Sequence, residues 1–310
     1  MYAGSKAFFY ALSHSAMLKR LASRHGLATS ESFANRFIAG ETIEAAIEAS
    51  RRLQSQGLLV TLDHLGERVT TIEEAAAATE DYVRLMGIIV DAGIERNISL
   101  KLTQLGIDVD RATCVDNLRR ILEPAARHTF FVRIDMENSP YTERTLEIFE
   151  AVWEQEYRNL GVALQSYLYR TEADVRRMNE LGARVRLVKG AYKEPSSVAY
   201  QQKGEVDSAF VRLARVLLDE GTYPAIATHD PELIEGVRTY AASRGIATDR
   251  FEFQMLYGIR RDLQASLAAA GHRVRVYVPF GREWFPYFMR RLGERPANVG
   301  FVLTALVRER

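Results

Sequence analysis

The sequence predicts an α/β protein built on one (β/α)8 barrel, with extra helices before the barrel. Two observations predict this fold. Eight short runs rich in β-branched and aromatic residues alternate with longer amphipathic stretches, and no Pro-, Gly- or Ser-rich linker divides the chain. Repeated β/α units predict a parallel sheet, and eight of them match the number that closes a barrel. An open doubly wound sheet is the alternative for this order of elements.

Eight short apolar runs are the predicted strands. Their length, and their content of Val, Ile, Leu, Tyr and Phe, are typical of buried strands. In chain order they cover residues 58–66, 98–106, 130–137, 162–169, 184–192, 223–230, 251–258 and 273–281.

The stretches between these strands are predicted to be helices. Their apolar residues recur every three to four positions, and several stretches end in Gly, as helices often do. Residues 1–55 also have a helical pattern, and we expect them to pack as a segment on a barrel of residues 56–310. The predicted barrel helices cover residues 72–93, 115–128, 143–157, 172–182, 206–221, 231–245 and 260–271.

The composition excludes several classes of protein. The chain has 310 residues, 47% of them hydrophobic, which is enough for a large core. Its formal charge of +1 is spread along the sequence, so we expect no nucleic-acid partner. The single cysteine, Cys114, excludes an intramolecular disulfide and indicates a reducing compartment. We see neither a signal peptide nor a membrane span and expect a soluble, cytoplasmic protein, with a first helix amphipathic enough to contact a membrane or partner.

The common motifs of several enzyme classes are missing. The six histidines do not have the spacing of metal ligands, so no metal is expected. The sequence has no G-x-S-x-G elbow, no P-loop and no G-x-G-x-x-G fingerprint, which are the usual signs of a hydrolase, a nucleotide kinase and a Rossmann dinucleotide site. A barrel enzyme with this sequence must bind its ligand in another way.

Polar and charged residues recur toward the C-terminal ends of the predicted strands. In a (β/α)8 barrel all these ends meet at one mouth, which is where such enzymes carry out their chemistry. Any one of these residues could simply be a solvated strand end, but the repeated placement favours a functional site. The set is Asp63, Glu67, Lys101, Asp135, Gln165, Arg186, Lys189, His229 and Tyr277.

A run near the C-terminus, "YFMRRLGE", predicts an anion-binding helix face. Positions three and four apart share a face, so Tyr287, Arg290, Arg291 and Glu294 converge. Paired guanidinium groups bind a carboxylate or phosphate through hydrogen bonds of fixed geometry. Adjacent arginines are usually only solvated, but the nearby tyrosines Tyr277 and Tyr287 favour a small anionic ligand.

Two lysines at strand ends leave the reaction class open at this point. Lys101 in "ISLKLTQ" or Lys189 in "RLVKGAY" could form a Schiff base with a carbonyl substrate, as in barrel aldolases. The surrounding positive charge of Arg186 and the arginine pair would lower a lysine pKa, but it would equally suit a large polyanionic cofactor. The residues alone do not separate these two interpretations.

Taken together, several motifs resemble those of the proline dehydrogenase family. They occur in order between residues 58 and 302, and the most specific are "RLVKGAY" and the Y-x-x-R-R-x-x-E run. The resemblance implies a (β/α)8 barrel enzyme that uses FAD to oxidise L-proline to Δ1-pyrroline-5-carboxylate. The other motifs are "ISLKLTQLG", "RIDME", "LQSYLYR", "IATHD", "FEFQMLYG" and "VYVPFG".

The resemblance also implies how proline is bound. Arg290, Arg291 and Lys101 would hold the substrate carboxylate, and Tyr277 and Tyr287 would pack on the pyrrolidine ring. The paired arginines would then place the C5 hydride over flavin N5.

Three further positions complete the implied substrate site. Leu256 would line the ring pocket, and Asp135 would orient Lys101 or the tyrosines. Glu67 would be a gate residue that pairs with Arg290 in the empty enzyme and releases it when proline arrives.

By the same resemblance a second group of residues belongs to the FAD site. Arg186 would lie close to flavin N5, where its positive charge stabilises the reduced flavin anion. Glu294 would contact the cofactor and support the arginine helix. The implied cofactor-binding residues are Gln165, Arg186, Lys189, Gly190, Ala191, His229 and Glu294.

The sequence also differs from the bifunctional members of the family. Lys193 stands where "GAYW" is common in them, and no aldehyde dehydrogenase domain follows the barrel. The product would therefore pass to a separate pyrroline-5-carboxylate dehydrogenase through transient contact. The family implies a membrane quinone as electron acceptor, reached by peripheral contact with the membrane. Hydroxyproline dehydrogenases share much of the pattern and are the alternative, although the bulk of Tyr277 disfavours a hydroxyl group.

Overall fold

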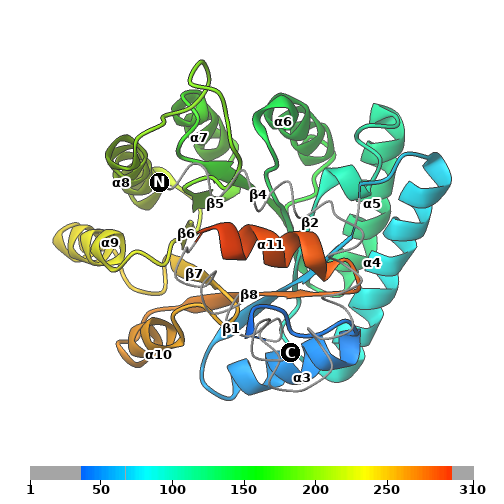
Figure 1. The fold of residues 1–310 in the computed structure, drawn as a ribbon, viewed down its shortest axis with the longest axis horizontal. Coiled ribbons are helices and arrows are strands. Elements are labelled where there is room, and N and C mark those ends of the chain that lie inside the picture. Colours follow the sequence, from blue (N-terminus) through cyan, green and yellow to red (C-terminus); the bar gives the residue numbers. More distant parts are fainter. Residues whose placement is uncertain (1–35, 67, 295–310) are drawn as a thin grey trace, which may run out of the picture.

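A computed structural model, which describes residues 36–66 and 68–294, shows a closed barrel of eight parallel strands in the order β1 to β8 (Figure 1). Every strand pairs with its sequence neighbours, and β1 pairs with β8, as between Thr61 and Tyr277. The predicted (β/α)8 fold is confirmed. The strands are β1 (Leu59–His64), β2 (Asn97–Leu100), β3 (Phe131–Ile134), β4 (Leu160–Gln165), β5 (Arg184–Val188), β6 (Ala225–Ala227), β7 (Glu252–Leu256) and β8 (Val274–Phe280).

The helices begin and end at recognisable signals. The Thr71 side chain accepts from the Glu74 backbone at the start of α4, and Gly93, in the left-handed conformation, ends that helix. Asp110 caps α5, which therefore begins four residues before the predicted position 115. The helices that follow β1 to β7 are α4 (Ile72–Ala92), α5 (Arg111–Arg127), α6 (Ser139–Trp153), α7 (Thr171–Glu180), α8 (Lys203–Glu220), α9 (Pro231–Ser243) and α10 (Arg261–Ala269).

Two further helices do not follow the simple β/α alternation. Helix α3 (Ile43–Gln54) precedes the barrel and packs on β1 and β8. The last helix that the structure describes, α11 (Trp284–Glu294), follows β8 and lies across the barrel in Figure 1. Its apolar residues cluster with Phe37, Ile38 and Leu65, apart from the main core. Helix α3 thus covers the outer face at the junction of β1 and β8, and α11 is placed over the mouth.

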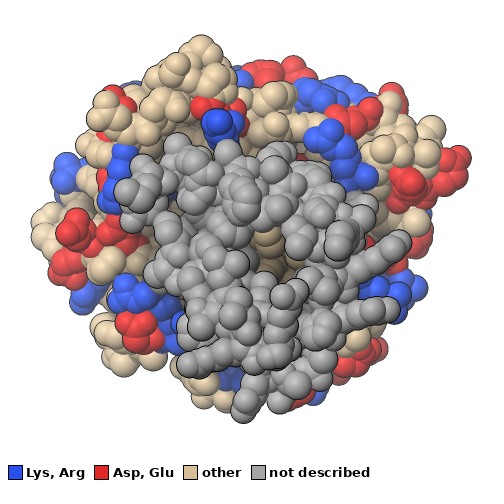
Figure 2. Space-filling model, in the orientation of Figure 1, with Lys and Arg blue, Asp and Glu red and all other residues tan. Residues whose placement is uncertain are grey.

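The described part of the face in Figure 2 carries Lys and Arg side chains next to Asp and Glu side chains. This mixture fits the spread charge of the sequence. In residues 36–66 and 68–294 we find no helix that is both long enough and apolar enough to cross a membrane.

The barrel interior contains buried charges. Successive residues of a strand face opposite sides, so the apolar positions pack under the helices while the alternate positions point inward. Arg275 on β8 donates to Glu252 on β7 from Nε (2.8 Å) and to Glu95 from Nη1 (2.6 Å). Glu252 and Arg275 lie at the N-terminal ends of their strands, and Glu95 lies just before β2. Ion pairs therefore close the bottom of the barrel, and the opposite end is left for the site.

Candidate active site

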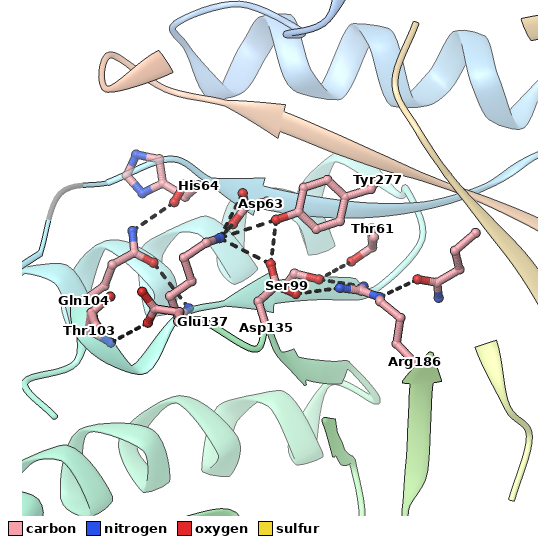
Figure 3. Close-up of polar contacts among 12 residues, drawn as sticks. Thr61, Asp63, His64, Ser99, Thr103, Gln104, Asp135, Glu137, Arg186 and Tyr277 are labelled. Atoms are coloured by element: carbon pink, nitrogen blue, oxygen red, sulfur yellow. Dashed lines mark hydrogen bonds and ion pairs between the residues drawn. The ribbon is translucent and has the colours of Figure 1, made fainter. Parts of the chain in front are cut away.

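Four strands bring polar side chains to one point at the C-terminal end of the barrel (Figure 3). Lys101, directly after β2, places its Nζ 3.2 Å from an oxygen of Asp63 and 3.2 Å from an oxygen of Asp135. The Tyr277 hydroxyl lies 3.4 Å from the same Nζ. Asp63 is on β1, Asp135 follows β3 and Tyr277 is on β8. We call these four residues the lysine cluster.

Asp135 is the common acceptor in this cluster. Its Oδ2 accepts from the Tyr277 hydroxyl at 2.6 Å and from Lys101, and its Oδ1 accepts from Arg186 Nη1 at 2.5 Å. Burial alone would raise the pKa of the Asp135 carboxyl, but the charges of Lys101 and Arg186 lower it below the ordinary value. The carboxylate is therefore ionised and holds three groups in fixed relative positions.

The ammonium group of Lys101 is stabilised in its charged form. Burial would lower its pKa, but the carboxylates of Asp63 and Asp135 outweigh this effect and raise the pKa above the ordinary lysine value. A lysine that attacks a carbonyl needs a lowered pKa so that its amine is neutral. The observed environment keeps the ammonium charged and so disfavours nucleophilic attack.

Arg186, on β5, is buried beside the cluster and is held by further polar groups. Its Nε donates to Gln254 Oε1 at 2.5 Å and its Nη2 donates to Ser99 Oγ at 2.9 Å. The guanidinium carbon lies 5.3 Å from the centre of the Tyr277 ring, which allows a cation–π contact. Arg186 thus adds a second fixed positive charge next to Lys101.

The sequence pattern assigns no role to three groups in this region. Asp63 is recognisable there only as a polar strand end, and Ser99 and Gln254 do not stand out. Strand periodicity is the signal that could have found two of them, since Ser99 lies two residues before Lys101 and Gln254 two residues before Leu256. Residues so spaced face the same side of a strand, here the barrel interior.

The residues expected at the cofactor lie on other strands and have their own partners. Gln165, at the end of β4, donates from Nε2 to the Glu137 carbonyl at 2.8 Å. His229, after β6, accepts from the Leu256 backbone N–H at Nε2 (2.9 Å), so its ring proton belongs on Nδ1. Leu256 is also the register partner of Tyr277, which brings β7 next to the lysine cluster.

Lysines at the end of β5 and the start of α8 form a group suited to phosphate. Lys189 Nζ lies 2.5 Å from Asp207 and 3.2 Å from Asp230, and Lys203 contacts the same two carboxylates. Both lysines lie near the N-terminus of α8, where backbone N–H groups also favour an anion. The donor chemistry fits the diphosphate of a dinucleotide cofactor. Within the described ranges, no three His, Cys, Asp or Glu side chains are grouped as metal ligands.

Gly190 takes a backbone conformation that only glycine adopts readily. Its φ is 118°, and a Cβ there would lie 2.5 Å from the ring of Tyr167. Ala191, the next residue, is exposed at the mouth. The chain therefore turns closely against Tyr167 between Lys189 and Ala191.

We expect Gly190→Ala to lower the free energy of unfolding by about 1–3 kcal/mol, because the new side chain is strained and collides with Tyr167. Urea denaturation followed by circular dichroism measures this change. Gly204→Ala is the matched control: Gly204 is in the first turn of α8 with open space around it, so alanine should be neutral or stabilising by up to about 1 kcal/mol. Equal stability of the two variants would contradict the close turn.

The C-terminal helix is described only in part. Tyr287 on α11 is buried in the cluster of Phe37, Ile38 and Leu65, and Tyr277 packs against that same cluster. The two tyrosines expected at the substrate ring are thus brought to one region. Of residues 290–294 the structure describes the backbone as helix and not the side chains. Four expected site residues therefore lie outside the described side chains: the gate residue Glu67, the clamp residues Arg290 and Arg291, and the cofactor residue Glu294.

Comparison with known proteins identifies the family. A model of the proline dehydrogenase family matches residues 46–304. The chain is 41% identical to proline dehydrogenase 2 of Bacillus subtilis (strain 168) over 305 residues, which are 98% of this chain and 99% of that protein. It is 42% identical over 279 residues to a proline dehydrogenase of Deinococcus radiodurans, covering 89% of this chain and 90% of that protein.

Solved structures agree with this result. The chain matches proline utilization A (PutA) from Bdellovibrio bacteriovorus inactivated by N-propargylglycine with a TM-score of 0.78 and 27% identity. The match covers 84% of this chain and 32% of the PutA chain, so this chain spans about a third of that protein. The family that the sequence motifs predicted is confirmed by these matches, and the chain belongs to the proline dehydrogenase family.

Proposed function

We propose that this oxidoreductase of the proline dehydrogenase family converts L-proline to Δ1-pyrroline-5-carboxylate with FAD as its cofactor. The observation that carries the proposal is the lysine cluster beside Arg186. It combines a charged, fixed ammonium with a buried guanidinium at the mouth of the barrel. Such a site suits an anionic substrate and a reaction in which negative charge develops nearby.

Lys101 would bind the proline carboxylate together with Arg290 and Arg291. Asp63 and Asp135 fix its Nζ, so little side-chain freedom is lost when the substrate arrives. Tyr277, whose hydroxyl is held by Asp135, would present its ring to the pyrrolidine ring, with Leu256 beside it. This clamp orients the substrate, and the C–H bond that breaks is at C5 of proline, away from the carboxylate.

FAD, when bound, would take up the hydride from proline C5. Arg186 supplies a buried positive charge that stabilises negative charge developing on the cofactor. Lys189 would exchange its contacts with Asp207 and Asp230 for a phosphate of the cofactor. Gln165 and His229 would bind other polar groups of the cofactor. Gly190, Ala191 and Glu294 complete this proposed set of cofactor-binding residues.

The pH dependence of the reaction should come from the substrate amine. The pKa of Asp135 is lower in the folded protein than in the unfolded chain, where it is about 4, so the Asp135 carboxylate stabilises the fold above about pH 4. This contribution is lost only as the pH falls through the lower pKa of the folded protein. The pKa of Lys101 is higher in the folded protein than in the unfolded chain, so the charged ammonium stabilises the fold below about pH 10.5. This contribution is lost only as the pH rises through the higher pKa of the folded protein. The cluster therefore keeps its charges between these limits.

We expect the logarithm of kcat/KM for L-proline to rise by about one per pH unit between pH 6 and 9, because only the neutral amine can form the imine. Steady-state kinetics in buffers of constant ionic strength measure this slope. An inflection within that range, absent from the titration of the substrate alone, would show that a group of the enzyme also controls the reaction.

The product and the electrons would leave by separate routes. We propose that the product passes to a pyrroline-5-carboxylate dehydrogenase through transient contact, and that a quinone accepts the electrons during peripheral contact with a membrane. The proposed location is the cytoplasm, at the inner face of the membrane during turnover. We propose that hydroxyproline is disfavoured as substrate because the bulk of the Tyr277 ring, whose hydroxyl is held by Asp135, would oppose an added hydroxyl.

The Schiff-base alternative is disfavoured by the carboxylates around both lysines. The pKa of Lys101 is raised rather than lowered, and Lys189 is paired with two carboxylates. The environment of Lys101 does not favour the neutral amine that an aldolase requires.

The visible spectrum of the purified protein, before and after anaerobic addition of L-proline, tests the proposal. A flavin spectrum that bleaches with L-proline is the expected result. A flavin that stays oxidised would exclude proline as substrate. A colourless protein that gains no flavin on reconstitution, and is trapped by borohydride with a carbonyl substrate, would favour the aldolase.

A further inference from the structure

A buried glutamine on β7 contacts the Arg186 guanidinium. Gln254 is 4% exposed, and its Oε1 accepts from Arg186 Nε at 2.5 Å. It lies in the motif "FEFQMLYG", in which Leu256 was the one residue expected to have a function. The resemblance and the site described above leave Gln254 without a role.

The orientation of the Gln254 amide follows from its second partner. Its other end contacts Oε1 of Glu252, which is 2% exposed and accepts from Arg275 Nε at 2.8 Å and Nη2 at 3.0 Å. An ionised carboxylate only accepts hydrogen bonds, so the NH2 group of Gln254 must face Glu252. Burial alone would raise the pKa of Glu252, but the charge of Arg275 lowers it, which keeps the carboxylate ionised. The carbonyl oxygen of Gln254 is therefore directed at Arg186.

Arg186 is held along three edges of its planar group by three strands. Nε donates to Gln254 on β7, Nη1 to Asp135 after β3 and Nη2 to Ser99 on β2. A guanidinium has five N–H donors in one plane, so three fixed acceptors determine both its position and its tilt. Of these acceptors, Gln254 is the one linked to the ion pairs at the bottom of the barrel.

We propose that Gln254 is a positioning residue for Arg186: anchored by Glu252 and Arg275, it directs an acceptor at Nε and so fixes the orientation of the guanidinium at the cofactor. This inference rests on the proposed flavin-dependent function. Gln254 acts through Arg186 and does not itself contact the substrate. Its contribution is to the rate and energetics of flavin reduction by L-proline, whereas Lys101 contributes to substrate binding.

An amide is the side chain that this position requires. It must accept from Arg186 at one end and donate to Glu252 at the other, and methionine, of similar length, can do neither. Gln254→Glu keeps an acceptor but places two carboxylates in contact. Exchanging both residues, as Glu252→Gln with Gln254→Glu, restores one donor and one acceptor with the same net charge. Arg275 then keeps the Glu95 carboxylate as its ionic partner.

The test compares holoenzymes of the wild type, Gln254→Met and the exchanged double variant. For Gln254→Met we expect a crystal structure in which the Arg186 guanidinium is rotated away from its Asp135 and Ser99 contacts. We also expect a more negative reduction potential of the bound flavin. The rate of flavin reduction by L-proline should fall by about tenfold, comparable with the loss of an outer partner at a metal site, while KM changes little. The exchanged variant should recover most of this rate.

Asn117→Leu is the matched control. Asn117 is another buried amide, on α5, and donates to the Leu105 carbonyl at 3.1 Å away from the barrel interior. Its loss should lower stability without moving the flavin potential. The proposal would be overturned if Arg186 did not move in Gln254→Met, or if the flavin reduction potential of that variant were unchanged. It would also be overturned if the rate of flavin reduction fell no more in Gln254→Met than in Asn117→Leu.

The two proposals fail in different ways. If the wild-type flavin does not bleach with L-proline, the proposed function is wrong, and the position of Arg186 in the two crystal structures still decides the role of Gln254. If the wild type bleaches and Arg186 keeps its orientation in Gln254→Met, the function stands and the positioning role is refuted.

Discussion

Asp135→Ala is expected to lower the free energy of unfolding by about 3–5 kcal/mol, because it leaves the buried Arg186 cation without its carboxylate. The remaining partners of Arg186, Ser99 and Gln254, are neutral, so they cannot replace the lost charge. Among the residues that the structure describes, Asp63 is then the carboxylate that still pairs with Lys101. Chemical denaturation of the purified variant measures this loss.

The same substitution should lower kcat/KM for L-proline by about a hundredfold or more. Asp135 holds Lys101, Tyr277 and Arg186 together, and small displacements of groups that position a substrate cost about that much. Asp135→Asn keeps the shape but not the charge and should lie between the wild type and Asp135→Ala in both measurements.

Asp219→Ala is the matched control for this prediction. Asp219 accepts from the Tyr240 hydroxyl at 2.6 Å and from Arg244 Nε at 3.1 Å, the same kinds of partner as Asp135 has, but at the outer surface between α8 and α9. Its loss should cost about 1 kcal/mol or less and leave kcat/KM unchanged. If Asp135→Ala behaved like this control, the lysine cluster would not organise the site.

The fold could be predicted because local pattern and architecture agree. Apolar runs of strand length alternate with helical stretches, and the order of these elements is predicted correctly even where their first and last residues are not. The run 98–106 shows how such errors arise: β2 ends at Leu100, and Leu102–Gln104 form a 3-10 turn, although the apolar pattern continues. Composition alone does not mark where a barrel strand bends outward.

The placement of the last helix could not be predicted in the same way. Its amphipathic pattern shows that α11 buries one face, but not which surface covers that face. Phe285 and Phe288 share a buried cluster with Phe37 and Leu65, which are distant in sequence, and this cluster places the helix over the mouth. Helix α3 lies on β1 and β8 instead. Such pairings depend on the closed tertiary structure.

The meeting of polar strand ends at one mouth was predicted, and the contacts among them were not. The charged strand ends indicated which residues meet, since all strands of the barrel point to one mouth. The partners of Arg186 were missed because Ser99 and Gln254 look like ordinary polar residues in apolar strands. Glu252 and Arg275 resemble solvated charges in the sequence, yet both are buried in the barrel interior. Only closure of the sheet brings them together.

Arg291→Met is expected to raise KM for L-proline by roughly 30-fold or more, which corresponds to about 2 kcal/mol or more for the loss of one partner from a desolvated charge pair. Arg291 follows Tyr287 by four residues on α11, so both occupy one helix face, and Tyr287 is buried with Leu65 near Tyr277. The change in kcat should be smaller, because the carboxylate is bound equally before and during the reaction. The amount of bound flavin, read from the visible spectrum, should stay the same.

A substrate without a carboxylate isolates the contribution of this clamp. Pyrrolidine offers the same ring and amine, so Arg291→Met should narrow the difference in kcat/KM between L-proline and pyrrolidine, mainly by slowing L-proline. Arg291→Lys retains the charge but not the planar pair of donors and should lose less than Arg291→Met. Arg84→Met, at an exposed arginine of α4 paired with Asp81, is the control and should alter neither substrate. If KM for L-proline were unchanged in Arg291→Met, the carboxylate would have to be held by Lys101 and Arg290 without it.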